Sequence, residues 1–227
     1  MKKLTTVLLV SLLATITTKA QTYVQAGLNL ANITSTNNGQ TQDNKWLPTF
    51  NVGIMSRFGI SKTFDLESGL LFTGKGAKAE ATSGSDYVKV KFNPLYIELP
   101  LNAVVKIPLT ANAKQNIFFH AGPYVAVGVA GKSTTDVSLA GVTSHTSSAI
   151  KFNNDDPTTS QQEGAAYDRL KRFDYGINLG GGFDFGKLLL RANYGFGLAK
   201  INSTQTNNSS NDKNKFRTFS ISVGIPL

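Results

Sequence analysis

The sequence has no cysteine, and this absence excludes disulfide bonds, thiol catalysis and cysteine-ligated metals. Histidine is scarce as well: His120 and His145 are the two in the chain, and their separation does not match a ligand pair. We therefore expect neither a metal nor a cofactor. Long apolar runs are also missing after residue 20, because no stretch there approaches the roughly 18–20 residues that a membrane-spanning helix requires. If the chain crosses a membrane, it must cross as β-strands.

The first twenty residues have the layout of a secretory signal peptide. Lys2 and Lys3 form a basic start, residues 4–16 form a short apolar segment, and the small residue Ala20 precedes Gln21. The apolar segment is too short for a transmembrane helix. We expect residues 1–20 to be a signal peptide that is removed on export, and residues 21–227 to form one β domain.

Alternation of apolar with small or polar side chains is the main pattern in the rest of the chain. In residues 173–185, Phe173, Tyr175, Ile177 and Leu179 share one parity, and glycine, asparagine and aspartate occupy the other. A period of two indicates a β-strand whose two faces differ. In a narrow transmembrane barrel the apolar face contacts lipid, and the small and charged face lines the interior.

Eight such stretches predict an all-β fold, an eight-stranded antiparallel up-and-down transmembrane β-barrel. We expect strands at 22–32, 47–60, 64–77, 94–107, 117–130, 173–185, 187–201 and 216–227. The connectors alternate between long polar segments (33–46, 78–93, 131–172 and 202–215) and short ones (61–63, 108–116 and 186). This alternation is typical of outer-membrane barrels, with long loops outside the cell and both termini in the periplasm.

Two prolines interrupt the predicted strands. Pro100 and Pro123 each remove one N–H from the hydrogen-bond ladder, so we expect a bulge or bend at each position. In the alternative interpretation, the strand that contains Pro100 ends at Leu99.

Several short motifs, in order along the chain, resemble the PorT-like outer-membrane β-barrel family. They are Tyr23–Asn29, Leu70–Gly76, Tyr96–Leu101, His120–Tyr124 and Tyr175–Gly182. This resemblance implies a small eight-stranded porin-like barrel of Gram-negative outer membranes. It implies no biochemical activity, because these motifs define no residue set for one.

The inward parity of the predicted strands carries many charges. They are Arg57, Glu67, Glu98, Lys106, Asp174, Asp184 and Arg191, with His120 beside them. Side chains just fill the lumen of an eight-stranded barrel, and buried charges must pair there. We therefore predict a structural charge network across the lumen, with Glu67 and Glu98 accepting hydrogen bonds from Arg57 and Arg191.

These features predict an integral outer-membrane barrel with a filled lumen and a structural or surface-interaction role. No Ser-His-Asp set has a common location, so no catalytic residue is expected. The alternatives are a narrow channel for small solutes, an outer-membrane enzyme that uses His120, and a soluble periplasmic lipid-binding barrel with the apolar parity inside. Inward charges disfavour the last alternative.

The basic residues bear on the partners of the protein. Lys2, Lys3 and Lys19 leave with the signal peptide, which lowers the formal net charge from +9 to +6. The other basic residues are scattered, with no aromatic-plus-basic motif, so we expect no nucleic-acid binding. We expect a monomer that contacts outer-membrane lipids, including anionic headgroups. Loop 131–172 is the candidate contact for an extracellular or cell-envelope protein.

Overall fold

The computed structural model describes residues 20–37, 40–42, 44–110, 115–152, 169–201 and 214–227. The predicted signal peptide lies outside these described residues, apart from Ala20, which is the first residue of β1. The described part of the chain contains thirteen β-strands. None of its segments forms a helix long and apolar enough to cross a bilayer.

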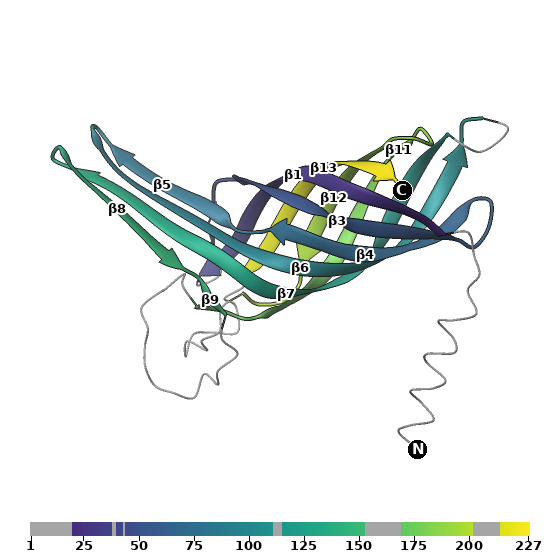
Figure 1. Ribbon diagram of the computed structural model, residues 1–227. Coiled ribbons are helices and arrows are strands. Elements are labelled where there is room, and N and C mark those ends of the chain that lie inside the picture. The colour runs from purple at the N-terminus through teal and green to yellow at the C-terminus, as the bar shows by residue number, and fades with distance from the viewer. Residues whose placement is uncertain (1–19, 38–39, 43, 111–114, 153–168, 202–213) are drawn as a thin grey trace, which may run out of the picture.

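Eight of the strands in the described part close into a ring, which confirms the predicted fold class (Figure 1). In ring order they are β1 (Ala20–Asn37), β3 (Leu47–Gly59), β4 (Phe64–Gly74), β6 (Asp86–Pro108), β7 (Asn116–Leu139), β11 (Phe173–Asp184), β12 (Leu189–Gly197) and β13 (Lys215–Pro226). Each neighbouring pair is antiparallel, and β1 pairs with β13 to close the barrel. Because the ring is closed, each of its eight strands pairs with a neighbour on both sides, and the barrel has no unpaired edge strand.

A four-stranded sheet extends β6 and β7 beyond one end of the barrel (Figure 1). The added strands β5 (Ala77–Ser83) and β8 (Val142–Ala149) pair with β6 and β7 respectively. We call this element the projecting sheet; it comprises β5, residues 86–94 of β6, residues 131–139 of β7, and β8. Three short strands lie near the same end: β2 (Gln40–Gln42) pairs with β1, and β9 (Lys151–Phe152) pairs with β10 (Arg169–Leu170).

The projecting sheet corrects the prediction of polar loops at 78–93 and over the first part of 131–172. Both segments are strands, because Val88, Val90 and Phe92 alternate with polar residues and β6 continues through them. Residues 33–37 and 40–42 are likewise strand and not loop. The remaining parts of the predicted loops, 153–168 and 202–213, lie outside the described residues. One predicted strand is too long: the strand expected over 187–201 covers only Leu189–Gly197, which is β12.

Of the bulge or bend predicted at Pro100 and Pro123, the bulge is wrong at both positions, because neither strand pair changes register there. The β7–β11 register is unbroken through Pro123, which lies opposite Ile177. The β6–β7 register is the same on both sides of Pro100, and β6 continues to Pro108 instead of ending at Leu99. The register shift in this pair lies between Leu95 and Tyr96, where the projecting sheet meets the barrel.

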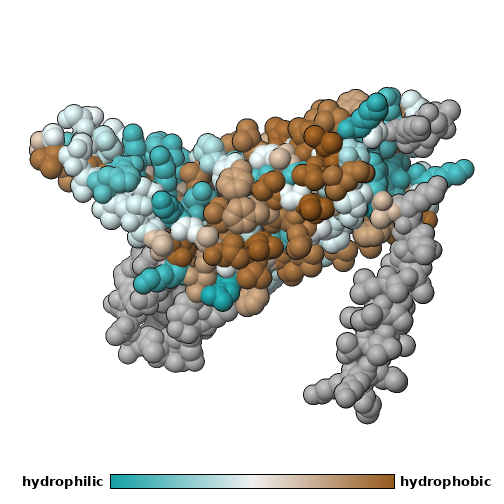
Figure 2. Space-filling model, viewed as in Figure 1, coloured by the Kyte–Doolittle hydropathy of each residue, from teal (hydrophilic) through white to brown (hydrophobic). Residues whose placement is uncertain are grey.

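The two faces of the barrel wall differ as the alternation predicts. The outward side chains are apolar and exposed, and they form a brown band across the face of the barrel seen in Figure 2. Examples are Leu28 at 75% exposure and Phe119 at 56%. The inward side chains are buried, and Met55 and Glu67 both have 0% exposure. An exposed apolar band of this kind is the surface that a bilayer covers.

Candidate functional site

A cluster of four charges lies inside the barrel at the end where the short turns lie; we call it the turn-end cluster. Glu67 on β4 accepts from Arg57 on β3, with Nη2–Oε2 at 3.0 Å and Nε–Oε2 at 3.1 Å. Arg191 on β12 donates to the same oxygen at 2.5 Å. Arg57 Nη1 also lies 3.4 Å from Asp184 Oδ2. Two cations therefore face two carboxylates, so the formal charges of the cluster balance.

Neutral groups complete the turn-end cluster. The Tyr23 hydroxyl donates to Glu67 Oε2 at 2.8 Å, and Arg191 Nη2 donates to the Tyr23 oxygen at 2.8 Å. The Phe118 ring lies 4.5 Å from the Arg57 guanidinium and 5.5 Å from that of Arg191. An apolar group of buried residues packs in the same layer: Tyr23, Met55, Val104, Phe118 and Leu189. This end of the lumen thus contains paired charges embedded among large side chains.

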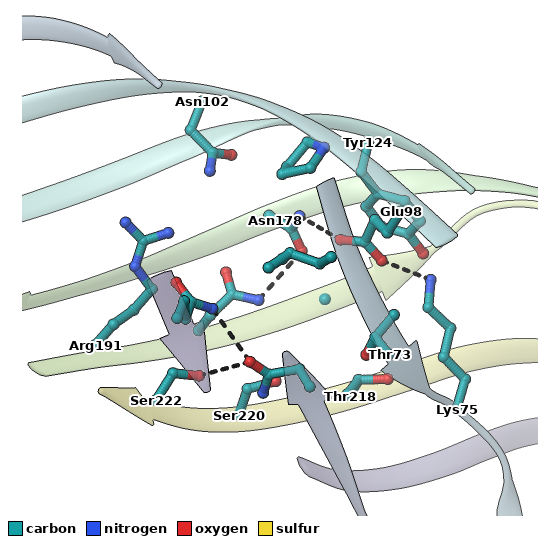
Figure 3. Close-up of a pocket in the computed structure, with 16 residues that line it drawn as sticks. Thr73, Lys75, Glu98, Asn102, Tyr124, Asn178, Arg191, Thr218, Ser220 and Ser222 are labelled. Carbon is teal, nitrogen blue, oxygen red and sulfur yellow. Dashed lines mark hydrogen bonds and ion pairs between the residues drawn. The ribbon is translucent and has the colours of Figure 1, made fainter. Parts of the chain in front are cut away.

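A second group, the loop-end cluster, lies toward the projecting sheet. Lys75 follows the last residue of β4, and its Nζ is 2.9 Å from Glu98 Oε2 and 2.8 Å from Asp174 Oδ2. The Tyr124 hydroxyl donates to Asp174 at 3.1 Å, and Asn178 donates to Glu98 at 3.1 Å. Lys75 also lies 4.1 Å from the centre of the Tyr124 ring. Figure 3 shows Lys75 and Asn178 approaching Glu98 from opposite sides.

Apolar residues cover the loop-end cluster on the side away from the turns. This cap consists of Ile33, Ala77, Phe92, Tyr96, Tyr124, Ala126, Ile150, Leu170, Ile201 and Phe216, with Phe152 packed against them. Phe152 and Phe216 both contact Tyr96 edge to face, with ring centres 5.6 Å apart in each pair. Phe152 reaches this position because Gly128 has no side chain: a Cβ there would lie 2.1 Å from the Phe152 ring.

A polar cavity of about 40 Å³ lies between the two clusters (Figure 3). Amide and hydroxyl side chains line much of its wall, and Arg191 and Lys75 mark its two ends. Gln25 Oε1, Asn102 Oδ1 and Arg191 Nε are buried and have no hydrogen-bond partner among the described residues. A volume of this size has room for at least one water molecule, which such groups bind well.

The remaining predicted residues lie apart from the two clusters. Lys106 pairs with Asp65 at 2.6 Å near the turn end. His120 is buried, and its Nε2 lies 2.9 Å from Asn193 Oδ1. The described residues include no group of three His, Cys, Asp or Glu side chains that could hold a metal ion.

The pairing differs in one respect from the network expected from the sequence. Both arginines bind Glu67, whereas Glu98 pairs with Lys75 in the other cluster. Sequence reasoning missed Lys75, although it has the same parity as Glu67 and Thr73 and is the next residue of that parity after Thr73. Asp65 and Tyr23 were also missed as partners of the buried charges. Parity could have identified all three residues as inward-facing.

Comparisons with known proteins agree with this architecture. The family described as outer membrane protein beta-barrel domain matches residues 18–203 of the chain. No curated protein sequence matches the chain.

The comparison with solved structures finds, among others, three bacterial proteins. Ail, the attachment invasion locus protein of Yersinia pestis, solved with a heparin analogue, has 13% identity and a TM-score of 0.41, covering 92% of this chain and 99% of that one. Neisserial surface protein A has the same four values. OprG from Pseudomonas aeruginosa has 10% identity and a TM-score of 0.40, covering 92% and 97%.

Proposed function

This chain belongs to the outer membrane protein β-barrel domain family, and we propose that it acts as a structural or surface-interaction protein with a side-chain-filled lumen. In this proposal the barrel anchors the projecting sheet at the cell surface, conducts no solutes and performs no catalysis. The long connectors face the outside, both termini lie in the periplasm, and residues 1–20 are a signal peptide removed on export. The protein is a monomer.

One observation carries the proposal: two different layers of side chains fill the barrel interior. At the turn end, Arg191 reaches Glu67 across the interior, and Arg57 on the neighbouring strand β3 binds the same carboxylate. At the loop end, Phe152, Phe216 and Tyr96 pack together over Lys75. A solute would have to break paired buried charges in one layer and separate packed aromatic rings in the other. Breaking a buried ion pair costs roughly 3–5 kcal/mol, which disfavours a standing pathway.

The surroundings of His120 support a role without catalysis. Its Nε2 faces the amide oxygen of Asn193, whereas a catalytic dyad would need a carboxylate or a nucleophile in contact with the ring. Its other ring nitrogen is buried and has no described partner. We interpret His120 as a packed interior residue.

We also propose that the chain belongs to the narrower PorT-like group. Support comes from the order of its motifs, among them Tyr96–Leu101 on β6 and Tyr175–Gly182 on β11. In both motifs the inward positions carry the lumen residues described above, including Glu98 and Asn178.

Conductance measurements test the filled lumen. The purified full chain is reconstituted into planar bilayers, and heat-modifiable migration on a gel verifies that the barrel is folded. We expect no steady open-channel current from folded protein. Steady currents that scale with the amount of folded barrel would refute the filled lumen.

A narrow channel for small solutes is the second candidate. The polar cavity near Asn102 and Asn178 favours it, because a polar segment already lies between the two layers. The same bilayer measurement distinguishes the candidates, because a channel gives currents in the wild-type protein without any substitution.

A further inference from the structure

The projecting sheet has one basic face. Side chains of Lys45, Lys78, Lys89, Lys91 and Lys132 lie on it, and we call this surface the basic face. Its members come from four segments: Lys78 lies opposite Lys91 across the β5–β6 pair, and Lys132 lies opposite Asn93 on β7. Lys45 joins them through a bridge to Lys78 and an ion pair with Glu80.

The basic face continues the lipid-facing side of the barrel wall. Along β6, the outward positions are Val105, Leu101, Leu99 and Ile97 within the barrel, and the same parity continues through Lys91 and Lys89. The change from brown to teal along this side is visible in Figure 2. Lys91 is four residues beyond Leu95, or about 13 Å along the strand, and roughly 9 Å along the bilayer normal at the usual tilt. With Leu95 taken as the edge of the apolar band, Lys91 lies at the outer margin of the headgroup region, which is roughly 5–8 Å thick on each side of the hydrocarbon core.

Carboxylates on this face are too few to neutralise the lysines. Glu80 pairs with both Lys45 and Lys78, with each Nζ–Oε distance at 2.8 Å. Asp136 contacts His145 across the β7–β8 pair. No described carboxylate lies within ion-pair distance of Lys89, Lys91 or Lys132. Lys89 instead lies over the Tyr87 ring, 4.5 Å from its centre.

A groove of about 430 Å³ runs along this part of the sheet. Its lining comprises Tyr87, Lys89 and Lys91 of β6, Asp136 and Val137 of β7, and Thr143, Ser144 and His145 of β8, so one carboxylate, held by His145, lies among the ammonium and hydroxyl groups. An aromatic ring, ammonium groups and hydroxyls together match a phosphorylated sugar, whose ring stacks on the tyrosine and whose phosphate pairs with lysine. A phospholipid headgroup without a sugar would use the lysines alone.

We propose that the basic face binds the phosphorylated sugar headgroup of a glycolipid in the outer leaflet of the outer membrane. The acyl chains of that lipid lie against the apolar side chains of β6 and β7, among them Ile97, Leu99, Val125 and Val127. Lys89 and Lys91 contact its phosphate, and the groove beside Tyr87 holds its sugar. This inference rests on the proposed orientation, with the projecting sheet outside the cell.

Native mass spectrometry of the folded full chain in detergent tests the inference. The protein is titrated with bisphosphorylated lipid A, with lipid A from which both phosphates have been removed, and with phosphatidylglycerol. We expect bisphosphorylated lipid A to bind most tightly at 0.15 M salt. The double variant Lys89→Gln/Lys91→Gln should bind it roughly 30-fold more weakly, at about fivefold per lysine.

The matched control removes two exposed lysines at the turn end, in Lys62→Gln/Lys187→Gln. It carries the same net charge as the double variant, so a general charge effect would weaken both equally. Equal weakening in the two variants overturns the proposal, as does equally tight binding of dephosphorylated lipid A or of phosphatidylglycerol. Heat-modifiable migration verifies that both variants are folded. Bilayer conductance, which tests the filled lumen, is independent of every one of these outcomes.

Discussion

Glu67 and Arg191 are 124 positions apart in the sequence, yet their side chains meet directly inside the barrel. Glu67 lies on β4 and Arg191 on β12, and four strand-to-strand steps separate these strands in either direction around the ring. The ion pair therefore spans the barrel diameter. Arg57 on β3 and Asp184 on β11 are also four steps apart and also pair. Two crossed ion pairs thus join opposite walls of the barrel at one level.

Replacing Glu67 should strongly destabilise the barrel. In Glu67→Gln, two buried guanidinium groups would share Asp184 as their remaining carboxylate, and an uncompensated buried charge costs roughly 3–5 kcal/mol. Urea titration of the barrel in lipid vesicles, followed by the fraction that migrates as folded on a gel, measures the change. The exposed Lys62→Gln at the turn between β3 and β4 provides the control and should leave the urea midpoint close to that of the wild type.

The double variant Glu67→Gln/Arg191→Gln should lose less stability than the two single variants combined. One guanidinium leaves together with the carboxylate that compensated it, so the two substitutions are coupled. Strictly additive losses would contradict a direct energetic link between these two side chains.

Gly128→Ala should displace Phe152 from the cap. The new Cβ would lie 2.1 Å from the Phe152 ring, so the ring must move or the strand must shift. Overpacking of this kind typically costs about 1–3 kcal/mol. The urea midpoint measures the loss, and Gly128→Ala/Phe152→Ala should recover part of it because the clash is removed.

The control for this substitution is Gly59→Ala at the end of β3. A Cβ at Gly59 has Asp65 Oδ1 as its nearest neighbour, at an ordinary contact distance of 3.6 Å. It should change the midpoint little. A loss at Gly59 equal to that at Gly128 would show that glycine itself, and not the contact with Phe152, sets the cost.

Strand parity made much of the barrel predictable from sequence. Alternation assigns each residue to a face, so the inward positions of Arg57, Glu67 and Arg191 follow from their parity. Alternation does not give the strand register or the partner across the lumen. For that reason the sequence alone could not show that Glu98 pairs with Lys75 and not with either arginine.

The projecting sheet was missed because polar composition was given more weight than periodicity. Residues 87–92 alternate strictly, with Val88, Val90 and Phe92 on one parity, which is a strand pattern. On β8, serine and threonine occupy both faces, so that strand has no apolar alternation to reveal it. The register shift at Leu95 and Tyr96 leaves no sequence signal, whereas the two prolines that suggested bulges lie in strand pairs that keep their register.

Glu80 should titrate at unusually low pH. Hydrogen bonds from Lys45 and Lys78 lower the pKa of this carboxyl, which lies in the projecting sheet, from 4.5 to about 2. Since the pKa is lower in the folded protein, the pair stabilises the sheet above about pH 4.5, and this contribution is lost as the pH falls toward 2. Carbon NMR of the Glu80 carboxyl across a pH series measures the midpoint. In Lys45→Gln the midpoint should rise, and a wild-type midpoint between 4 and 5 would contradict the prediction.

The absence of cysteine makes the orientation of the barrel directly measurable. A single cysteine in Ser144→Cys lies on the exposed strand β8 of the projecting sheet, and one in Lys187→Cys lies at the short turn between β11 and β12. With the long connectors outside the cell, a membrane-impermeant maleimide added to intact cells should label Ser144→Cys and leave Lys187→Cys unlabelled. Permeabilising the outer membrane should then expose Lys187→Cys to the reagent. The reverse pattern would place the projecting sheet in the periplasm, and the basic face would then have no access to the outer leaflet.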